Sequence, residues 1–299
     1  MHKARYNLFK LDFKLSPRSP VRVGAGGESP NPALPDLRFV RTFLAGKGEV
    51  IFVPGSSLKG VFRSFAERVL TAAKGEGKNG ACNLSADDSC GKRLEEEEER
   101  LQKILEPPEL YRESCNACKL FGNTKLKGRL TMLDAYPEGE IRTEVRHGVA
   151  ISRLTQAVSV GPYDIEVIIG GTFGARLLVE NFEAWQLGLI SLALRNMNEG
   201  FLKVGFGKSR GFGEMNAEVT DFEVLSARRY PQTEIWGIGK FLPKEEFERY
   251  GIRVSDGFVL SITPKEEMID GLQVRRAYSK EAWPDFSQSA IAHLREVFT

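Results

Sequence analysis

The order of alternating strands and amphipathic helices is the feature that most constrains how this chain folds. Residues Phe9–Leu15 alternate apolar and charged side chains, the pattern of a strand with one buried face. Ser56 and Ser57, residue types that cap helices, precede apolar residues at helical spacing over Leu58–Leu70. A second helix is predicted over Phe182–Met197. The chain therefore combines strands with helices.

The remaining strands give the order of the elements. Asp164–Ile169 and Thr172–Val179 are joined by Gly170-Gly171, which predicts a hairpin. Met215–Leu225 alternates again and follows the second helix. Strand, helix, strand pair, helix, strand is the βαββαβ plan of a ferredoxin-like fold, the architecture of RNA-recognition domains. We expect an α+β core over residues 1–225 and a C-terminal extension over residues 226–299.

All 4 cysteines lie between positions 82 and 118, in a segment with a run of glutamates. Cys82 and Cys90 are spaced C-x7-C, and Cys115 and Cys118 are spaced C-x2-C. The second spacing is that of a structural zinc knuckle, whereas the first is wider than usual. We expect a closed four-thiolate zinc site in an insertion over residues 74–118. Free thiols or a disulfide are the alternative.

The net charge of +2 averages two unlike regions. Residues 1–70 contain 12 basic and 5 acidic side chains, and residues 71–113 contain 7 and 11. A concentrated basic segment is one footprint of a polyanion-binding surface, although an excess of this size also arises among ordinary surface residues.

A glycine-rich loop, GFGKSRGFG over residues 205–213, adds Lys208 and Arg210. It lacks the frame of a nucleotide-hydrolysing P-loop. The loop is either a helix-to-strand connection that needs positive φ or a contact for an RNA backbone.

Several function classes are disfavoured. The 3 histidines, His2, His147 and His293, give no arrangement for nucleophilic catalysis. No apolar run approaches the ~20 residues of a membrane-spanning helix, and the N-terminus lacks the apolar stretch of a signal peptide. We expect a cytoplasmic protein with no membrane partner.

Four stretches resemble motifs of the RAMP superfamily, the repeat-associated proteins of CRISPR systems, and they occur in the order typical of its members. They are VPGSSLKGVFRSFAERVL, CKLFGNTKLKGRL, HGVAISRLTQAV and GFGKSRGFGEM. The resemblance covers roughly residues 5–225. The chain most resembles the backbone subunit of type III CRISPR effector complexes.

That resemblance implies a ferredoxin-like palm for guide RNA (crRNA) and a thumb hairpin within residues 153–168. It implies crRNA, target RNA, other type III subunits and further copies of this chain along the guide as partners. It assigns RNA contacts to Ser56, Ser57, Lys59, Arg63, Arg153, Lys208 and Arg210. A helix N-terminus with nearby cations suits phosphate on chemical grounds as well.

The resemblance also implies cleavage of target RNA. Backbone subunits use an aspartate before the PGSSLKG motif, with a divalent cation such as Mg²⁺, through attack by the RNA's own 2′-hydroxyl. Asp36 is the matching acid, although the segment after it is slightly longer, and an ordinary turn aspartate is the alternative. Arg38 and Arg41 would hold the phosphate. Whether the chain is an enzyme stays open at this point.

Two other functions remain. In the first, the chain is a standalone metal-independent endoribonuclease that processes precursor crRNA, although its first helix lacks the histidine that such enzymes often use. Alternatively, it would be a purely structural RNA-binding subunit in which Asp36 is inert.

Overall fold

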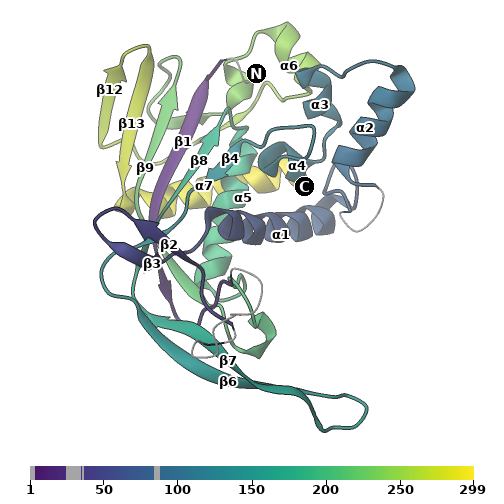
Figure 1. Cartoon of the computed structure of the whole chain (residues 1–299). Coiled ribbons are helices and arrows are strands. Elements are labelled where there is room, and N and C mark those ends of the chain that lie inside the picture. The colour runs from purple at the N-terminus through teal and green to yellow at the C-terminus, as the bar shows by residue number, and fades with distance from the viewer. Residues whose placement is uncertain (1–3, 25–34, 36, 84–87) are drawn as a thin grey trace.

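One antiparallel sheet organises the chain (Figure 1). The fold comes from a computed structural model, which describes residues 4–24, 35, 37–83 and 88–299. The strand order is β12-β13-β9-β1-β8-β4, and β5 also pairs with β8. These strands are β1 (Asn7–Pro17), β4 (Leu130–Met132), β5 (Tyr136–Pro137), β8 (Phe173–Glu180), β9 (Met215–Ser226), β12 (Glu266–Asp270) and β13 (Gln273–Ser279).

Alternation along β1 separates the two faces of this sheet. Phe9, Leu11, Phe13 and Leu15 are buried in the main core, and the side chains between them face the other way. Three long helices pack buried residues into the same core: α1 (Gly55–Lys74), α5 (Ala184–Asn198) and α7 (Trp283–Phe298), and shorter helices of the cysteine-bearing insertion add to it. The helices therefore cover one face and leave the other open.

The α+β, ferredoxin-like prediction is confirmed. The elements β1, α1, β4, β8, α5 and β9 follow the βαββαβ plan, with β1 and β8 at the centre. The predicted hairpin around Gly170-Gly171 is wrong, because β7 (Val158–Gly170) pairs with β6 (Arg142–Ile151) while β8 joins the sheet. Gly171, at φ +111°, turns the chain out of one pairing into the other. The middle strand pair of the core is β4 and β8.

The β6–β7 hairpin projects from the body of the molecule (Figure 1). Its base is held by bridges from Val21 to Ile168 and from Leu37 to Ile165. Strands β2 (Arg41–Leu44) and β3 (Gly48–Ile51) follow Leu37 in the chain and pair with each other as a short ribbon. The range expected for the thumb, residues 153–168, covers the hairpin turn and most of β7.

The cysteine-bearing insertion forms a compact module beside α1 (Figure 1). It contains α2 (Cys90–Leu101), α3 (Pro107–Glu113) and α4 (Asn116–Phe121). Ser89 caps α2 through its side chain, and Cys115 occupies the same position for α4.

The last 74 residues of the sequence, 226–299, build directly on the core. They contain β10 (Glu234–Trp236), α6 (Lys244–Tyr250) and β11 (Gly257–Val259) besides β12, β13 and α7. Strand β13 extends the sheet at β9. Gly188 lets α5 and α7 approach closely, because a Cβ there would lie 2.2 Å from the carbonyl oxygen of Ala290.

Candidate nucleic-acid interface and metal centre

The first turn of α1 contains Ser56 and Ser57, but neither caps the helix. Pro54 occupies the N-cap, so the predicted serine cap is wrong. The N–H of Gly55 donates to Asp134 Oδ1 at 2.7 Å. A carboxylate therefore already compensates the positive end of this helix, which limits its attraction for phosphate.

Lys59 and Arg63 lie one helical turn apart on α1, but their surroundings differ. Burial, with the charge of Arg63 adding to it, lowers the pKa of Lys59. Arg63 donates to Glu67 Oε1 at 2.8 Å, to the carbonyl of Gly122 at 3.1 Å and to Cys118 Sγ at 3.6 Å. The guanidinium of Arg63 thus faces the cysteine module.

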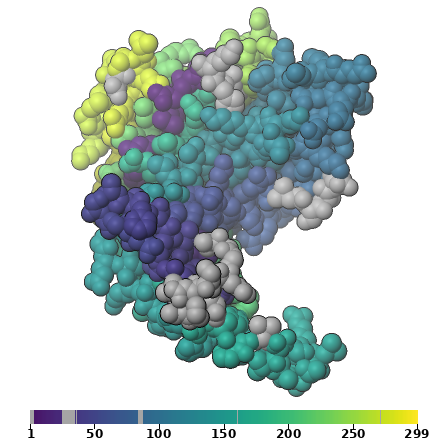
Figure 2. Space-filling model, in the orientation of Figure 1, coloured from purple at the N-terminus to yellow at the C-terminus, as the bar shows by residue number. Residues whose placement is uncertain are grey.

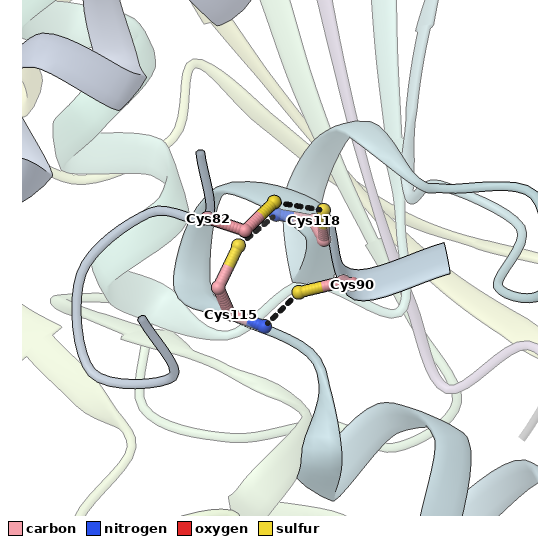
Figure 3. A group of neighbouring side chains, drawn as sticks. All are labelled: Cys82, Cys90, Cys115 and Cys118. Carbon is pink, nitrogen blue, oxygen red and sulfur yellow. Dashed lines mark hydrogen bonds between the residues drawn. The ribbon is translucent and has the colours of Figure 1, made fainter. Parts of the chain in front are cut away.

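The four cysteines are brought together as the sequence predicted, and all four are buried (Figure 3). Their sulfurs lie within 4.8 Å of one another. The Sγ atoms of Cys82 and Cys118 are 3.7 Å apart. Zinc–thiolate bonds of about 2.3 Å in a tetrahedron place sulfurs about 3.8 Å apart, whereas a disulfide requires about 2.05 Å. The donor set therefore fits a tetrahedral metal ion and excludes disulfides among these cysteines.

Backbone and thiol hydrogen bonds link the four sulfurs and favour the thiolate form at two of them. The N–H of Cys115 donates to Cys90 Sγ at 3.2 Å, and the N–H of Cys118 donates to Cys115 Sγ at 3.4 Å. Hydrogen bonds from Cys115 and Cys118 lower the pKa of Cys82 to about 6. The same two neighbours lower the pKa of Cys90, whereas hydrogen bonds within the cluster raise the pKa values of Cys115 and Cys118. Thiolate is the form that binds metal.

The glycine-rich loop is built from positive-φ glycines. Gly205, Gly207, Gly211 and Gly213 have φ of 84°, 71°, 84° and 92°, which confirms that the connection needs glycine. A Cβ on Gly205 would lie 2.0 Å from the carbonyl oxygen of Arg22. The loop is therefore pinned against the chain that follows β1.

This loop presents its cations beside aromatic rings. Lys208 and Arg210 are exposed on a short 3₁₀ turn, Lys208–Arg210. The guanidiniums of Arg22 and Arg210 lie 5.4 and 5.2 Å from the centre of the Phe206 ring. Arg210 also donates to the hydroxyl of Tyr163, on β7, at 3.3 Å. The loop and the base of the hairpin thus form one surface, here called the basic–aromatic cluster.

The basic–aromatic cluster also faces α1. Partial burial, with the charge of Arg68 adding to it, lowers the pKa of Lys208, so Arg68, on α1, lies near enough to the loop for its charge to act there. Figure 2 shows that the molecule is hollowed between the body that contains α1 and the projecting hairpin. The cluster consists of Arg22, Arg68, Tyr163, Phe206, Lys208 and Arg210.

Arg153 lies far along the hairpin, in its turn, and is exposed. Its neighbour Leu154 is 97% exposed. The structure does not bring Arg153 together with the other predicted contacts.

The segment after Asp36 is fastened to the hairpin. Asp36 itself lies outside the described residues. Leu37 donates its N–H to the carbonyl of Asp164 at 3.0 Å. Arg41 forms a two-pronged ion pair with Glu166, which also accepts the N–H of Phe39 at 2.9 Å. Arg41 is thus committed to Glu166, which weakens the expectation that it holds a phosphate.

The open face of the sheet differs from an RNA-recognition platform, which stacks bases on aromatic side chains. A ladder of ion pairs crosses it instead. Lys10 lies 3.2 Å from Asp12 and 3.5 Å from Glu223, Arg176 contacts Asp12 at 2.5 Å, and Arg275 contacts Glu223 at 2.7 Å. These cations are already paired, so the basic–aromatic cluster is the better candidate for RNA.

Sequence reasoning missed Arg22, Tyr163 and Phe206 as members of the cluster. Phe206 and Tyr163 carry a usable signal, because aromatic residues next to cations are typical of single-stranded RNA sites. Arg22 could not be selected, since it meets Phe206 only after the loop folds back on residues 20–23.

The family model described as RAMP superfamily matches residues 14–216, a range that begins near the end of β1 and includes α1, the cysteine module, the hairpin and the glycine-rich loop. No curated protein matches the chain. Within the described residues, no helix is long and apolar enough to cross a bilayer.

Proposed function

The chain belongs to the RAMP superfamily, whose members are CRISPR-associated RNA-binding proteins, and from this premise we propose that it is the guide-RNA-binding backbone subunit of a type III interference complex. Its partners are crRNA, target RNA, the other subunits of that complex and further copies of this chain along the guide.

One observation supports this proposal above the others. The basic–aromatic cluster gathers residues from the glycine-rich loop, α1, the hairpin and the segment after β1 beside a hollow of the surface. Exposed cations bind phosphates, and rings accept stacked bases without reading their sequence. That combination suits a guide whose own base pairing identifies the target.

In this proposal, each of the predicted residues contacts a different part of the guide RNA or supports a residue that does. Lys208 and Arg210 grip the backbone from the loop, and Lys59 with Ser56 and Ser57 extends the path along α1. Arg153 contacts RNA from the tip of the hairpin. Arg63 contributes mainly through the cysteine module that it faces.

The four cysteines hold zinc in this proposal. Cys82, Cys90, Cys115 and Cys118 supply four thiolates and leave no coordination position for a substrate, so the ion would serve the structure of the module and no reaction. Metal analysis of protein purified without chelator should find about one zinc per chain. Metal-free protein would contradict the site.

Target-RNA cleavage at Asp36, with a divalent cation such as Mg²⁺, is the catalytic part of the proposal. The O2′ of the target attacks the adjacent phosphorus, the P–O5′ bond breaks, and the products carry a 2′,3′-cyclic phosphate and a 5′-hydroxyl. Leu37, next along the chain, is fastened to β7 and thereby ties this segment to the hairpin.

The test is a reconstituted complex with Asp36→Ala. We expect assembly and guide binding to be unchanged and target cleavage to be lost. Undiminished cleavage would leave a purely structural RNA-binding subunit as the function of this chain.

A second candidate, the metal-independent endoribonuclease that processes precursor crRNA, is favoured by a different observation. His147 Nδ1 lies 2.6 Å from Asp164 Oδ1, and the exposed ring is available for proton transfer. Purified protein incubated with repeat RNA in chelator decides between the two. Specific cleavage that His147→Gln abolishes would favour this candidate.

A further inference from the structure

Arg63 connects α1 to the cysteine cluster. Its guanidinium has three acceptors: Glu67, one turn further along α1, the carbonyl of Gly122 and the sulfur of Cys118. Gly122 is the C-cap of α4, the helix whose N-cap is Cys115. One side chain therefore joins a sulfur, the end of α4 and the middle of α1.

Arg93, on α2, contacts a second sulfur of the cysteine site. It donates to Cys90 Sγ at 3.4 Å, and its Nε lies 3.5 Å from Asp88. Two of the four sulfurs thus face a guanidinium.

The negative charge of a zinc–tetrathiolate site explains why two guanidiniums lie beside its sulfurs. Four thiolates and one Zn²⁺ ion carry two net negative charges, and the sulfurs are buried. Buried charge that is not compensated destabilises a fold strongly. Side chains that hydrogen-bond to metal ligands typically change metal affinity about 10- to 100-fold when they are removed.

We infer that Arg63 and Arg93 are positioning residues of the zinc site. Through Arg63, metal binding also fixes the position of α1 and of its RNA-facing side chains. The inference rests on the zinc site of the proposed function and adds to it a link between metal and RNA. Lys59 lies one turn before Arg63, and the charge of Arg68 acts on Lys208 of the glycine-rich loop. A metal that fixes Arg63 therefore fixes the helix that lines the hollow.

The test measures zinc affinity by competition with a chromogenic chelator, using the whole chain and zinc alone. We expect Arg63→Met and Arg93→Met to bind zinc about 10- to 100-fold more weakly than wild type. Arg63→Lys should fall between, because an ammonium cannot meet three acceptors in one plane. Arg100→Met is the control, since Arg100 lies in the same module and pairs only with Glu97 among the described contacts.

Circular dichroism and melting at saturating zinc show whether each variant folds. If Arg63→Met does not fold, Arg63→Lys and Arg93→Met keep the test decisive. Zinc affinities equal to that of Arg100→Met would overturn the inference. The zinc titration contains no RNA. Failure of the protein to bind guide RNA would therefore contradict the proposed function without changing the measured zinc affinities.

A second measurement addresses the link to α1. Arg93→Met at limiting zinc should bind guide RNA more weakly than wild type and recover when zinc is added in excess. Arg93 lies on α2, outside the basic–aromatic cluster, so a direct loss of an RNA contact cannot produce this pattern. RNA affinity that does not follow zinc occupancy would overturn the link.

Discussion

Arg63 and Arg210 look alike in the sequence, as basic residues within RNA-binding motifs, but the structure uses them differently. Arg63 meets Glu67, the carbonyl of Gly122 and the sulfur of Cys118 inside the protein. Arg210 is exposed, stacks over Phe206 and donates to one hydroxyl at 3.3 Å. The cysteine module satisfies its cations internally, whereas the basic–aromatic cluster leaves the cations of its loop, Lys208 and Arg210, exposed to solvent.

The difference shows that the acceptors around a cation decide its role. A guanidinium with a sulfur and a carbonyl within reach stabilises the fold. A guanidinium above a ring keeps most of its donors for a ligand. Mutations in the module should therefore change stability first, and mutations in the cluster should change RNA affinity alone.

The largest effect is expected from removal of a metal ligand. Cys118→Ser should abolish zinc retention and lower the free energy of unfolding by several kcal/mol, because structural zinc contributes directly to folding. Zinc content and urea denaturation check this. A chelator added to wild type should reproduce the loss. A variant that keeps wild-type stability would remove the contrast between the two regions.

The next effect concerns the fastening of the hairpin. Glu166→Ala should cost about 3 kcal/mol, because it leaves the guanidinium of Arg41 and the N–H of Phe39 without their carboxylate. Glu144→Ala is the control, since its partner Arg146 is exposed, and we expect less than about 0.5 kcal/mol there. Equal urea midpoints for the two variants would show that the hairpin base is not held this way.

A buried carboxyl group in the protein interior, away from the proposed RNA surface, should make folding stability depend on pH. Burial, with Glu183 adding to it, raises the pKa of Asp256 to about 7. The folded state then holds a proton that the unfolded state releases above about pH 4, so stability should fall as pH rises from about 4 to 7.

Asp256→Asn should flatten this dependence in urea denaturation at pH 5 and pH 8. Asp256 also accepts the N–H groups of Ala184 and Gly239, so the variant should be less stable at pH 5. An unchanged pH dependence would assign the effect to another group.

The smallest effect is expected on the open face of the sheet. Lys14→Ala breaks an exposed pair with Glu138 at 3.0 Å and should change guide-RNA affinity and stability by less than about 0.5 kcal/mol. Titration with labelled guide RNA checks this. A loss comparable to that of Lys208→Ala would place RNA on this face.

The sequence predicted the parts of this molecule that depend on local pattern. Alternation in β1 and helical spacing in α1 and α5 identified the ferredoxin-like core, and clustering identified the four cysteines. Strand β6 was missed because its side chains are exposed or half-buried along its whole length, so it shows no apolar alternation. Without that partner, β7 was paired with β8.

The partners of single side chains were beyond the reach of the sequence. Arg63 follows the PGSSLKG motif, and nothing local shows that Gly122 and Cys118 fold back against it. The glycine-rich loop was open to two interpretations, and the positive φ of its glycines agrees with the structural one without removing the other. Long-range contacts decide such questions, and they exist only in the folded chain.

In the proposed function, the basic–aromatic cluster grips the guide-RNA backbone. The most direct test is guide-RNA affinity against salt concentration for wild type and for Lys208→Ala combined with Arg210→Ala. Each lost phosphate contact on a single strand should make the slope of log affinity against log salt shallower by about 0.7. We predict weaker binding and a slope shallower by about 1.4 for the double variant. An unchanged slope and affinity would contradict the account.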